Sequence, residues 1–183
     1  MTDVLVSVTW LQHNLDDVRL LDVRGEVVND LPRYRAYPDR YREGHIPGAA
    51  FANWHADFTD RDADVTVTVA SPEEFAADAT RLGIGAGTVV VAYDEYFNVL
   101  AGRIVWVLRS YGHGEAYLLD GGLSAWVRTG APLEGGDRHP RPADPPHPVP
   151  RRLDGLIDFA AVREAIASGA QLLDARKVSD YRG

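Results

Sequence analysis

Short, continuously apolar runs alternate with amphipathic segments along the first two thirds of the chain. Three such runs are RLLDVR (residues 19–24), TVVVAYD (88–94) and AYLLDGG (116–122). Runs of this length and composition are typical of strands buried on both faces of a parallel sheet. Around and between them, the spacing of apolar residues predicts helices over residues 9–15, 71–83 and 100–112. The alternation predicts an α/β domain.

The ends of the second and third predicted helices are marked by residues that favour helix termini. Ser71 can cap the backbone amides, Pro72 stands at the first helical position, and Glu74 completes a capping box with Ser71. Gly83 and Gly112 suit the left-handed conformation in which helices often end. We therefore expect both helices to form with these boundaries.

A proline-rich stretch interrupts the pattern after residue 135. Six prolines fall between Pro140 and Pro150, and no apolar period runs through them. This composition predicts an extended, solvated linker that stays stiff over several residues. We divide the chain into a first domain (1–135), a linker (136–153) and a C-terminal segment (154–183).

The C-terminal segment repeats the beginning of the chain. LIDFAAVREAIASGAQLLDAR (156–176) restates VSVTWLQHNLDDVRLLDVR (6–24), with a capping residue, an amphipathic helix and then Leu-Leu-Asp-X-Arg. Asp22 and Asp174 are 152 residues apart, and so are Arg24 and Arg176. This self-similarity indicates duplication into a tandem pair of domains. Because about 30 residues cannot enclose a core, we expect the segment to be the start of a second domain that is cut short.

Charge and residue content narrow the possible functions. The 183 residues carry a formal charge of −8, from 27 acidic and 19 basic side chains, which disfavours nucleic acid or a membrane surface as partner. The absence of a signal-like N-terminus and of a long apolar run leads us to expect a cytoplasmic protein. With no cysteine, the chain has no thiolate nucleophile. Its six scattered histidines predict no metal site, and no cofactor motif is present.

Two longer motifs carry a family resemblance. YREGHIPGAAF (41–51) follows an Asp-Val-Arg at a strand end, and LLDGGLSAW (118–126) covers the end of a later strand. With these motifs the chain resembles the amino-terminal domain of the tandem thiosulfate and 3-mercaptopyruvate sulfurtransferases of the rhodanese family. The resemblance implies a rhodanese-like, open, mostly parallel five-stranded sheet with helices on both faces. It also implies an enzyme that moves sulfane sulfur from a small-molecule donor to a thiophilic acceptor.

The resemblance implies that the sulfur is carried as a persulfide on a cysteine of the second domain. A loop leading from a buried strand into a helix points several N–H groups and the positive helix end at one place, which lowers the pKa of a thiol there. Carrying the 72-residue interval between Asp22 and Asp94 over to Asp174 predicts that cysteine near residue 246 of a longer chain. The present chain is therefore expected to be inactive by itself.

By the resemblance, Asp94 holds the position of the nucleophilic cysteine in the first domain. A carboxylate fits an anion-binding loop but has no reaction with sulfane sulfur, and Asp94 can also be a helix cap. The loop EYFNVLAG (95–102) is bulkier than a compact glycine-rich cradle, and Glu95 adds a second negative charge. Arg103 is interpreted as a structural arginine of the helix face, with pairing to Asp94 or stacking on Trp106 as alternatives.

The other motif residues of the first domain are assigned structural roles. Asp22 and Arg24 are expected to form an ion pair that ties a strand end to the GHIPGA turn (44–49), although function also gathers at that edge of parallel sheets. His45 is expected to be a hydrogen-bonded turn residue rather than a general base. Asp120 belongs to the LLDGG motif and is assigned a structural role as well.

Donor binding is assigned to the second repeat. In many family members a basic residue precedes the tyrosine after Asp-X-Arg, whereas Asp180 stands before Tyr181 here. Arg176 or Arg182 is expected to bind the anionic donor in its place. The sequence leaves the choice between thiosulfate and 3-mercaptopyruvate open.

A cysteine-free, rhodanese-like binding or regulatory module is the alternative function. The carboxylate of Asp94 and the acidic charge balance favour it. If the sulfurtransferase hypothesis holds, the first domain packs against its own second domain. Residues 151–183 are expected to expose apolar surface, through which two chains can form a dimer.

Overall fold

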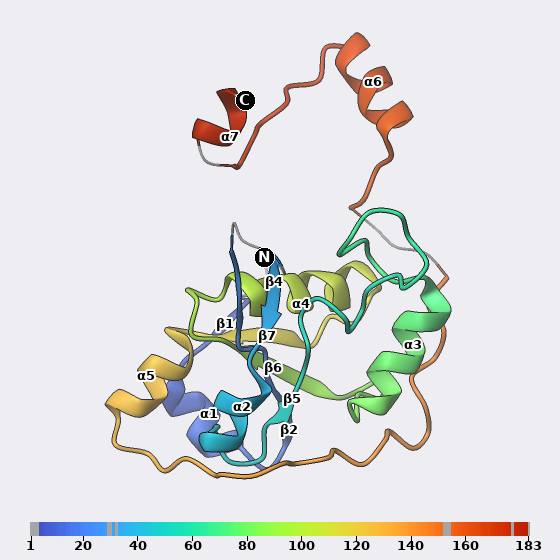
Figure 1. Ribbon diagram of the computed structural model, residues 1–183. Helices are drawn as coiled ribbons and strands as arrows, with labels where there is room; N and C mark the ends of the chain where they lie inside the picture. Colours follow the sequence, from blue (N-terminus) through green and yellow to red (C-terminus); the bar gives the residue numbers. More distant parts are fainter. Residues whose placement is uncertain (1–3, 29–30, 32, 152–154, 177, 183) are drawn as a thin grey trace.

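Five parallel strands form the central sheet of the chain (Figure 1). The computed structural model describes residues 4–28, 31, 33–151, 155–176 and 178–182. The strands lie in the order β1 (Leu5–Val6), β7 (Ala116–Leu119), β6 (Val89–Tyr93), β2 (Val18–Asp22) and β5 (Ala50–Phe51). Every neighbouring pair is parallel. The predicted five-stranded, mostly parallel α/β sheet is thus confirmed, with no antiparallel pair among these strands.

Helices cover both faces of the sheet, because successive strand residues point to opposite sides. Leu20 and Val91 belong to a core with residues of α1 (Val8–Asn14) and α5 (Gly122–Arg128). Their neighbours Leu21 and Val90 belong to a second core, with residues of α3 (Pro72–Arg81) and α4 (Val99–Ser110). These two cores account for the continuously apolar strand sequences.

The helix ends follow the sequence signals within one or two residues. The hydroxyl of Ser71 accepts a hydrogen bond from the amide of Glu74, and the Glu74 carboxylate accepts one from the amide of Ser71. Gly83 and Gly112 have φ angles of +75° and +87°, the left-handed conformation expected of them. The capping box and both glycine ends of these helices are therefore confirmed.

A small hairpin and a short helix follow β2, and the apolar pattern predicted neither. Strands β3 (Gly25–Val27) and β4 (Tyr34–Ala36) pair antiparallel, and α2 (Pro38–Glu43) comes next. Tyr41 of α2 is buried, and its hydroxyl donates a hydrogen bond to the main-chain oxygen of Ala49. Helix α2 is thereby fixed to the turn that leads into β5.

The proline-rich linker runs along the sheet domain (Figure 1), and most of its residues are exposed. It contains no helix or strand between residues 137 and 151, as expected. The amide of Ala143 donates to the main-chain oxygen of Thr80, and the amide of His147 donates to the Thr80 hydroxyl. The His147 side chain is buried and packs edge-on against Phe75. The exposure of most linker residues is as expected of a solvated segment, while α3 supplies hydrogen-bond partners and an apolar contact where Ala143 and His147 meet it.

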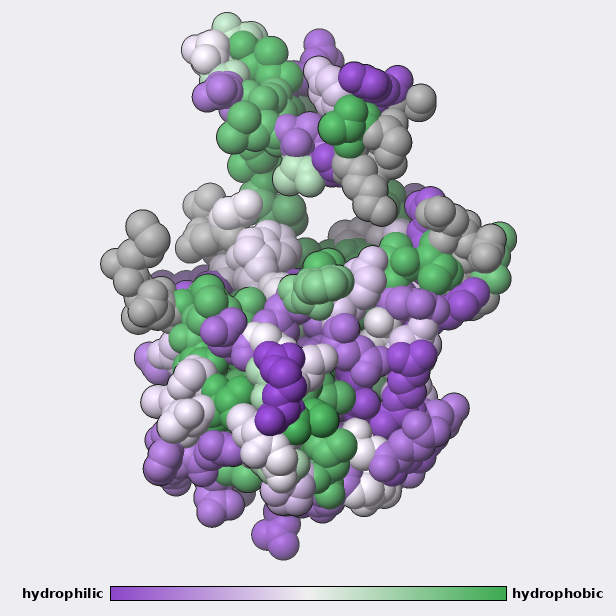
Figure 2. Space-filling model, turned by 90° about the vertical axis from the view of Figure 1, so that its left-hand side faces the viewer, coloured by the Kyte–Doolittle hydropathy of each residue, from purple (hydrophilic) through white to green (hydrophobic). Residues whose placement is uncertain are grey.

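The C-terminal segment carries α6 (Phe159–Ala167) and α7 (Val178–Arg182) and stands away from the sheet (Figure 1). The carboxylate of Asp158 caps α6 by accepting a hydrogen bond from the amide of Ala161. Helix α6 has no buried residue, and Figure 2 shows hydrophobic surface on this segment. None of the helices in the described residues is long and apolar enough to cross a membrane.

Candidate functional site

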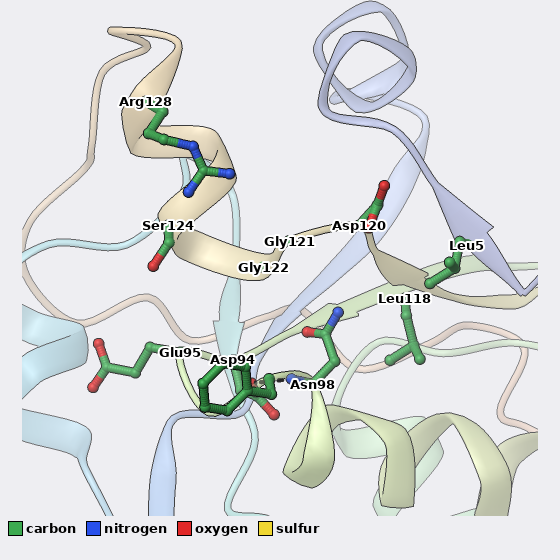
Figure 3. A pocket seen from close by; sticks show the side chains of 11 residues that line it. Leu5, Asp94, Glu95, Asn98, Leu118, Asp120, Gly121, Gly122, Ser124 and Arg128 are labelled. Carbon is green, nitrogen blue, oxygen red and sulfur yellow. Dashed lines mark hydrogen bonds between the residues drawn. The ribbon is translucent and has the colours of Figure 1, made fainter.

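A cavity of about 640 Å³ opens at the carboxyl ends of β6 and β7, between the loops that lead into α4 and α5. In Figure 3, Ser124 and Arg128 of α5 lie across this cavity from Glu95 and Asn98. Ligands of open parallel sheets bind at this edge, where loops from neighbouring strands meet. The cavity is therefore the candidate functional site of the sheet domain.

Asp94 lies at the base of this site, and four backbone N–H groups hold its side chain. One carboxylate oxygen accepts hydrogen bonds from the amides of Tyr96 and Asn98, each at 2.7 Å. The other accepts from the amides of Leu100 and Ala101 in the first turn of α4, each at 2.9 Å. Only 1% of Asp94 is exposed. A helix N-terminus and a curled loop thus form an anion cradle around a built-in carboxylate.

The loop around Asp94 is tighter than its bulky sequence suggests, because α4 begins at Val99 and leaves four residues outside the helix. Phe97 and Asn98 take positive φ angles of +55° and +58°, a conformation that is uncommon for residues other than glycine. The Asn98 amide group donates to the main-chain oxygen of Leu119, which joins this loop to β7. The negative charge of Glu95 is paired with Arg40.

Asp22 and Arg24 form a buried ion pair at the end of β2, 2.9 Å apart. Arg24 also donates to the main-chain oxygen of Gly44 at 2.7 Å, which ties the strand to the GHIPGA turn. The Tyr93 hydroxyl donates to Asp22 at 2.8 Å and accepts from the amide of Ile46. Burial raises the pKa of Asp22, and Arg24 opposes that rise; burial also raises the pKa of Tyr93. This network locks two loops together and leaves neither charge facing the cavity.

His45 is fully buried in the turn that follows α2. Its ring stacks on Tyr41 with centroids 4.0 Å apart, and its Nδ1 lies 2.9 Å from the main-chain oxygen of Tyr41. Main-chain hydrogen bonds in both directions join His45 to Glu134. The Glu134 carboxylate accepts from the amide of Gly48, which lowers the pKa of Glu134. These contacts give His45 a structural position, away from the cavity.

Arg103 points away from Asp94. Its guanidinium donates to the main-chain oxygens of Trp54 and Phe58 and to the hydroxyl of Thr59. Burial lowers the pKa of Arg103 to about 10. The alternatives of pairing with Asp94 or stacking on Trp106 are wrong, because the loop over residues 54–59 accepts the hydrogen bonds of the guanidinium.

The remaining candidate residues are exposed. Asp120 lines the cavity, and its amide donates to the main-chain oxygen of Val6. Arg176 pairs with Asp174 at 2.6 Å, and its hydrogen bond lowers the pKa of Asp174 to about 2. Arg182 is exposed on α7. The side chain of Asp180 lies outside the described residues. Within the described parts of the chain, no three His, Asp or Glu side chains gather as a metal site would require.

The sequence pattern did not predict two residues of the site. Asn98 bridges two loops, and Gly122 has a φ of +56° and lies against the main-chain oxygen of Asp94. A side-chain Cβ at Gly122 would lie 2.4 Å from that oxygen. The only sequence signal for this contact was the paired glycine of LLDGG, which marks a turn or a close backbone approach.

The fold and the strand-to-helix cradle define this protein as a rhodanese-like α/β domain. The family model described as Rhodanese-like domain matches residues 7–129, so the chain belongs to the rhodanese family. The crystal structure of SseA from Escherichia coli, a 3-mercaptopyruvate sulfotransferase by its description, superposes with a TM-score of 0.84 at 27% identity. That match covers 98% of this chain and 68% of the SseA chain.

Curated relatives carry names from sulfur metabolism. The chain is 34% identical to sulfur carrier protein TtuD of Thermus thermophilus, over 99% of this chain and 60% of the relative. It is 36% identical to human 3-mercaptopyruvate sulfurtransferase, over 78% of this chain and 48% of the relative. The chain thus spans about half to three fifths of the length of these relatives.

Proposed function

We propose that this chain is the amino-terminal, non-catalytic part of a sulfurtransferase of the thiosulfate or 3-mercaptopyruvate type. The whole protein would move sulfane sulfur from a small-molecule donor to a thiophilic acceptor. The family membership and the names of the relatives support this class of reaction. The chain alone contributes a folded domain and one wall of a cleft.

One observation carries the proposal. The anion cradle at the end of β6 holds the carboxylate of Asp94, in a chain that has no cysteine. In the proposed reaction a thiolate attacks the outer sulfur of thiosulfate, a sulfur–sulfur bond forms, and sulfite leaves with the electrons of the broken bond. The persulfide then gives its outer sulfur to the acceptor, cyanide becoming thiocyanate. A carboxylate forms no stable bond of this kind, so Asp94 binds the cradle without performing the reaction.

The reactive cysteine is placed in a second domain that begins in the C-terminal segment. The Asp174–Arg176 pair has the same hydrogen-bonding pattern as Asp22–Arg24, including the bond from the arginine amide to the aspartate two residues before it. This local likeness supports the tandem repeat and a cysteine near residue 246. Arg176 and Arg182 would then approach the donor once the second domain is complete.

The C-terminal segment supplies the contact with that second domain. Leu156, Phe159 and Leu173 are among its exposed apolar side chains, at 54%, 78% and 82%. Apolar surface of this kind is normally covered. We infer that the second domain covers it in the whole protein, and that residues 1–183 alone form dimers through it, which light scattering after size-exclusion chromatography would measure.

The test is to measure thiocyanate formation from cyanide, with thiosulfate or 3-mercaptopyruvate as the donor. Residues 1–183 should produce none above the uncatalysed rate, whereas the full-length protein should turn over. Replacing the cysteine near residue 246 with serine should abolish that turnover. Turnover by residues 1–183 would contradict the proposal that this part is inactive by itself. A full-length protein that lacks such a cysteine and still binds its ligand would favour the regulatory module instead.

A further inference from the structure

Arg19 occupies an unusual position at the end of the sheet opposite to Asp94. It is the second residue of β2 and pairs with Val90 of β6. The residue is partly buried, and its Nε atom is shielded from solvent without a hydrogen-bond partner. Across the described ranges its side chain forms no ion pair or hydrogen bond. A guanidinium nitrogen that is shielded from solvent normally has an anionic or carbonyl partner, and the Nε atom of Arg19 has none among the described residues.

Two further arginines from the linker lie at the same place. Arg138 is near enough for its charge to add to burial in lowering the pKa of Arg19. The main chain of Arg141 also passes close to Arg19: a Cβ on Gly83 would lie 2.7 Å from Nη2 of Arg19 and 2.8 Å from the main-chain oxygen of Arg141. Arg138 is paired with Glu134, at 3.3 Å. The charges of Arg19 and Arg138 therefore lie near each other, in a chain whose net charge is −8.

A cavity of about 510 Å³ lies beside Arg19, and the glycine-rich turn between α3 and β6 forms its floor. Arg141 lines the same cavity, as do Ala86 and Gly87 of that turn. The backbone amides of Ala86 and Gly87 donate to no acceptor within the described residues. Asp144 is the one carboxylate among the lining residues; Asp16 and Glu134 border an adjoining cavity of about 380 Å³.

We propose that Arg19, Arg141 and the amides of Ala86 and Gly87 bind a small tetrahedral oxyanion of the phosphate and sulfate class. A guanidinium donates two parallel N–H bonds to two oxygens of such an anion, and free turn amides can donate to a third. The bound anion neutralises Arg19 and links β2 to the linker. This site is separate from the cavity at Asp94, and the inference does not rest on the proposed sulfurtransferase function.

The test is a titration of residues 1–183 with sodium sulfate, phosphate and thiosulfate, followed by ¹H–¹⁵N NMR. Sodium chloride at matched ionic strength is the control for general screening. The oxyanions should shift the amide signals of Ala86 and Gly87 saturably, and chloride should not. Arg19→Gln should weaken the binding at least tenfold, whereas Arg163→Gln, which removes an exposed arginine of α6, should leave it unchanged.

Arg141→Gln provides a second variant, because this exposed side chain can be changed without disturbing the fold. It should weaken oxyanion binding several-fold while the circular dichroism spectrum stays the same. Equal shifts with chloride and oxyanions, or unchanged binding in both the Arg19 and the Arg141 variants, would overturn the proposal. In that case water alone solvates Arg19.

Discussion

The main-chain oxygen of Asp94 accepts a hydrogen bond of 3.0 Å from the amide of Leu123, which joins the loop after β6 to the turn after β7. The contact is possible because Gly122, the residue before Leu123, has no side chain. The base and one wall of the cavity are therefore built as one unit. The geometry around the Asp94 carboxylate depends on this close approach.

Gly122→Ala should lower the free energy of unfolding by about 2–4 kcal/mol, because it combines a left-handed backbone with a clash against main-chain oxygen. Gly130→Ala is the matched control, since Gly130 has a φ of +75° and nothing within 4 Å of its would-be Cβ. Gly130→Ala should lower the free energy of unfolding by only about 1 kcal/mol. Urea unfolding would measure both variants, and equal losses would contradict the role given to the Asp94–Gly122 contact.

The Asp-X-Arg ion pair occurs twice in the chain: Asp22–Arg24 is buried, and Asp174–Arg176 is exposed. Arg24→Gln should lower the free energy of unfolding by about 3–5 kcal/mol, because it leaves Asp22 charged and buried without its partner. Arg176→Gln breaks the corresponding exposed pair and should change stability by less than about 1 kcal/mol. Chemical denaturation of the two variants tests this, and a similar cost for both would show that burial does not decide the value of the pair.

Tyr41 should make the fold sensitive to alkaline pH. Burial raises the pKa of its hydroxyl from 10.0 to about 12. Since the folded-state pKa is above the unfolded one, this contribution to stability is complete below pH 10 and is lost as the pH rises from 10 through about 12. A shift of that size corresponds to roughly 2–3 kcal/mol.

Thermal unfolding followed between pH 8 and 12 would check this prediction. Tyr41→Phe lacks the ionisable hydroxyl, so its stability should fall less steeply above pH 10 than that of the unchanged chain. It should also be less stable by about 1 kcal/mol at pH 8, because the hydrogen bond to Ala49 is lost. Parallel pH curves for the two proteins would rule out the assignment.

Features encoded by neighbouring residues could be predicted from the sequence. The Ser71–Glu74 capping box needs only residues three apart, and the Asp22–Arg24 pair needs residues two apart at a strand end. Both therefore follow from local geometry. The parallel sheet followed from the apolar runs, because strands covered on both faces consist mainly of apolar residues.

Features that depend on distant parts of the chain could not be predicted. The cradle of Asp94 requires positive φ angles at Phe97 and Asn98. Neither residue is a glycine, so the sequence gives no sign of this conformation. The docking of the linker depends on where His147 meets α3. These contacts are set by packing between segments far apart in sequence. The spacing of apolar residues along the chain does not predict such packing.

The central claim is that the end of β6 is an anion cradle in which Asp94 stands where a nucleophilic thiolate would stand. Asp94→Cys tests it, with Ser124→Cys as the control because Ser124 is exposed and lines the same cavity outside the cradle. Thiolate absorbance at 240 nm, recorded against pH, gives the pKa of each thiol. The account predicts a pKa at least one unit below the usual value of about 8.5 for the cysteine at position 94, and one near 8.5 at position 124. A pKa at or above 8.5 at position 94 would contradict it.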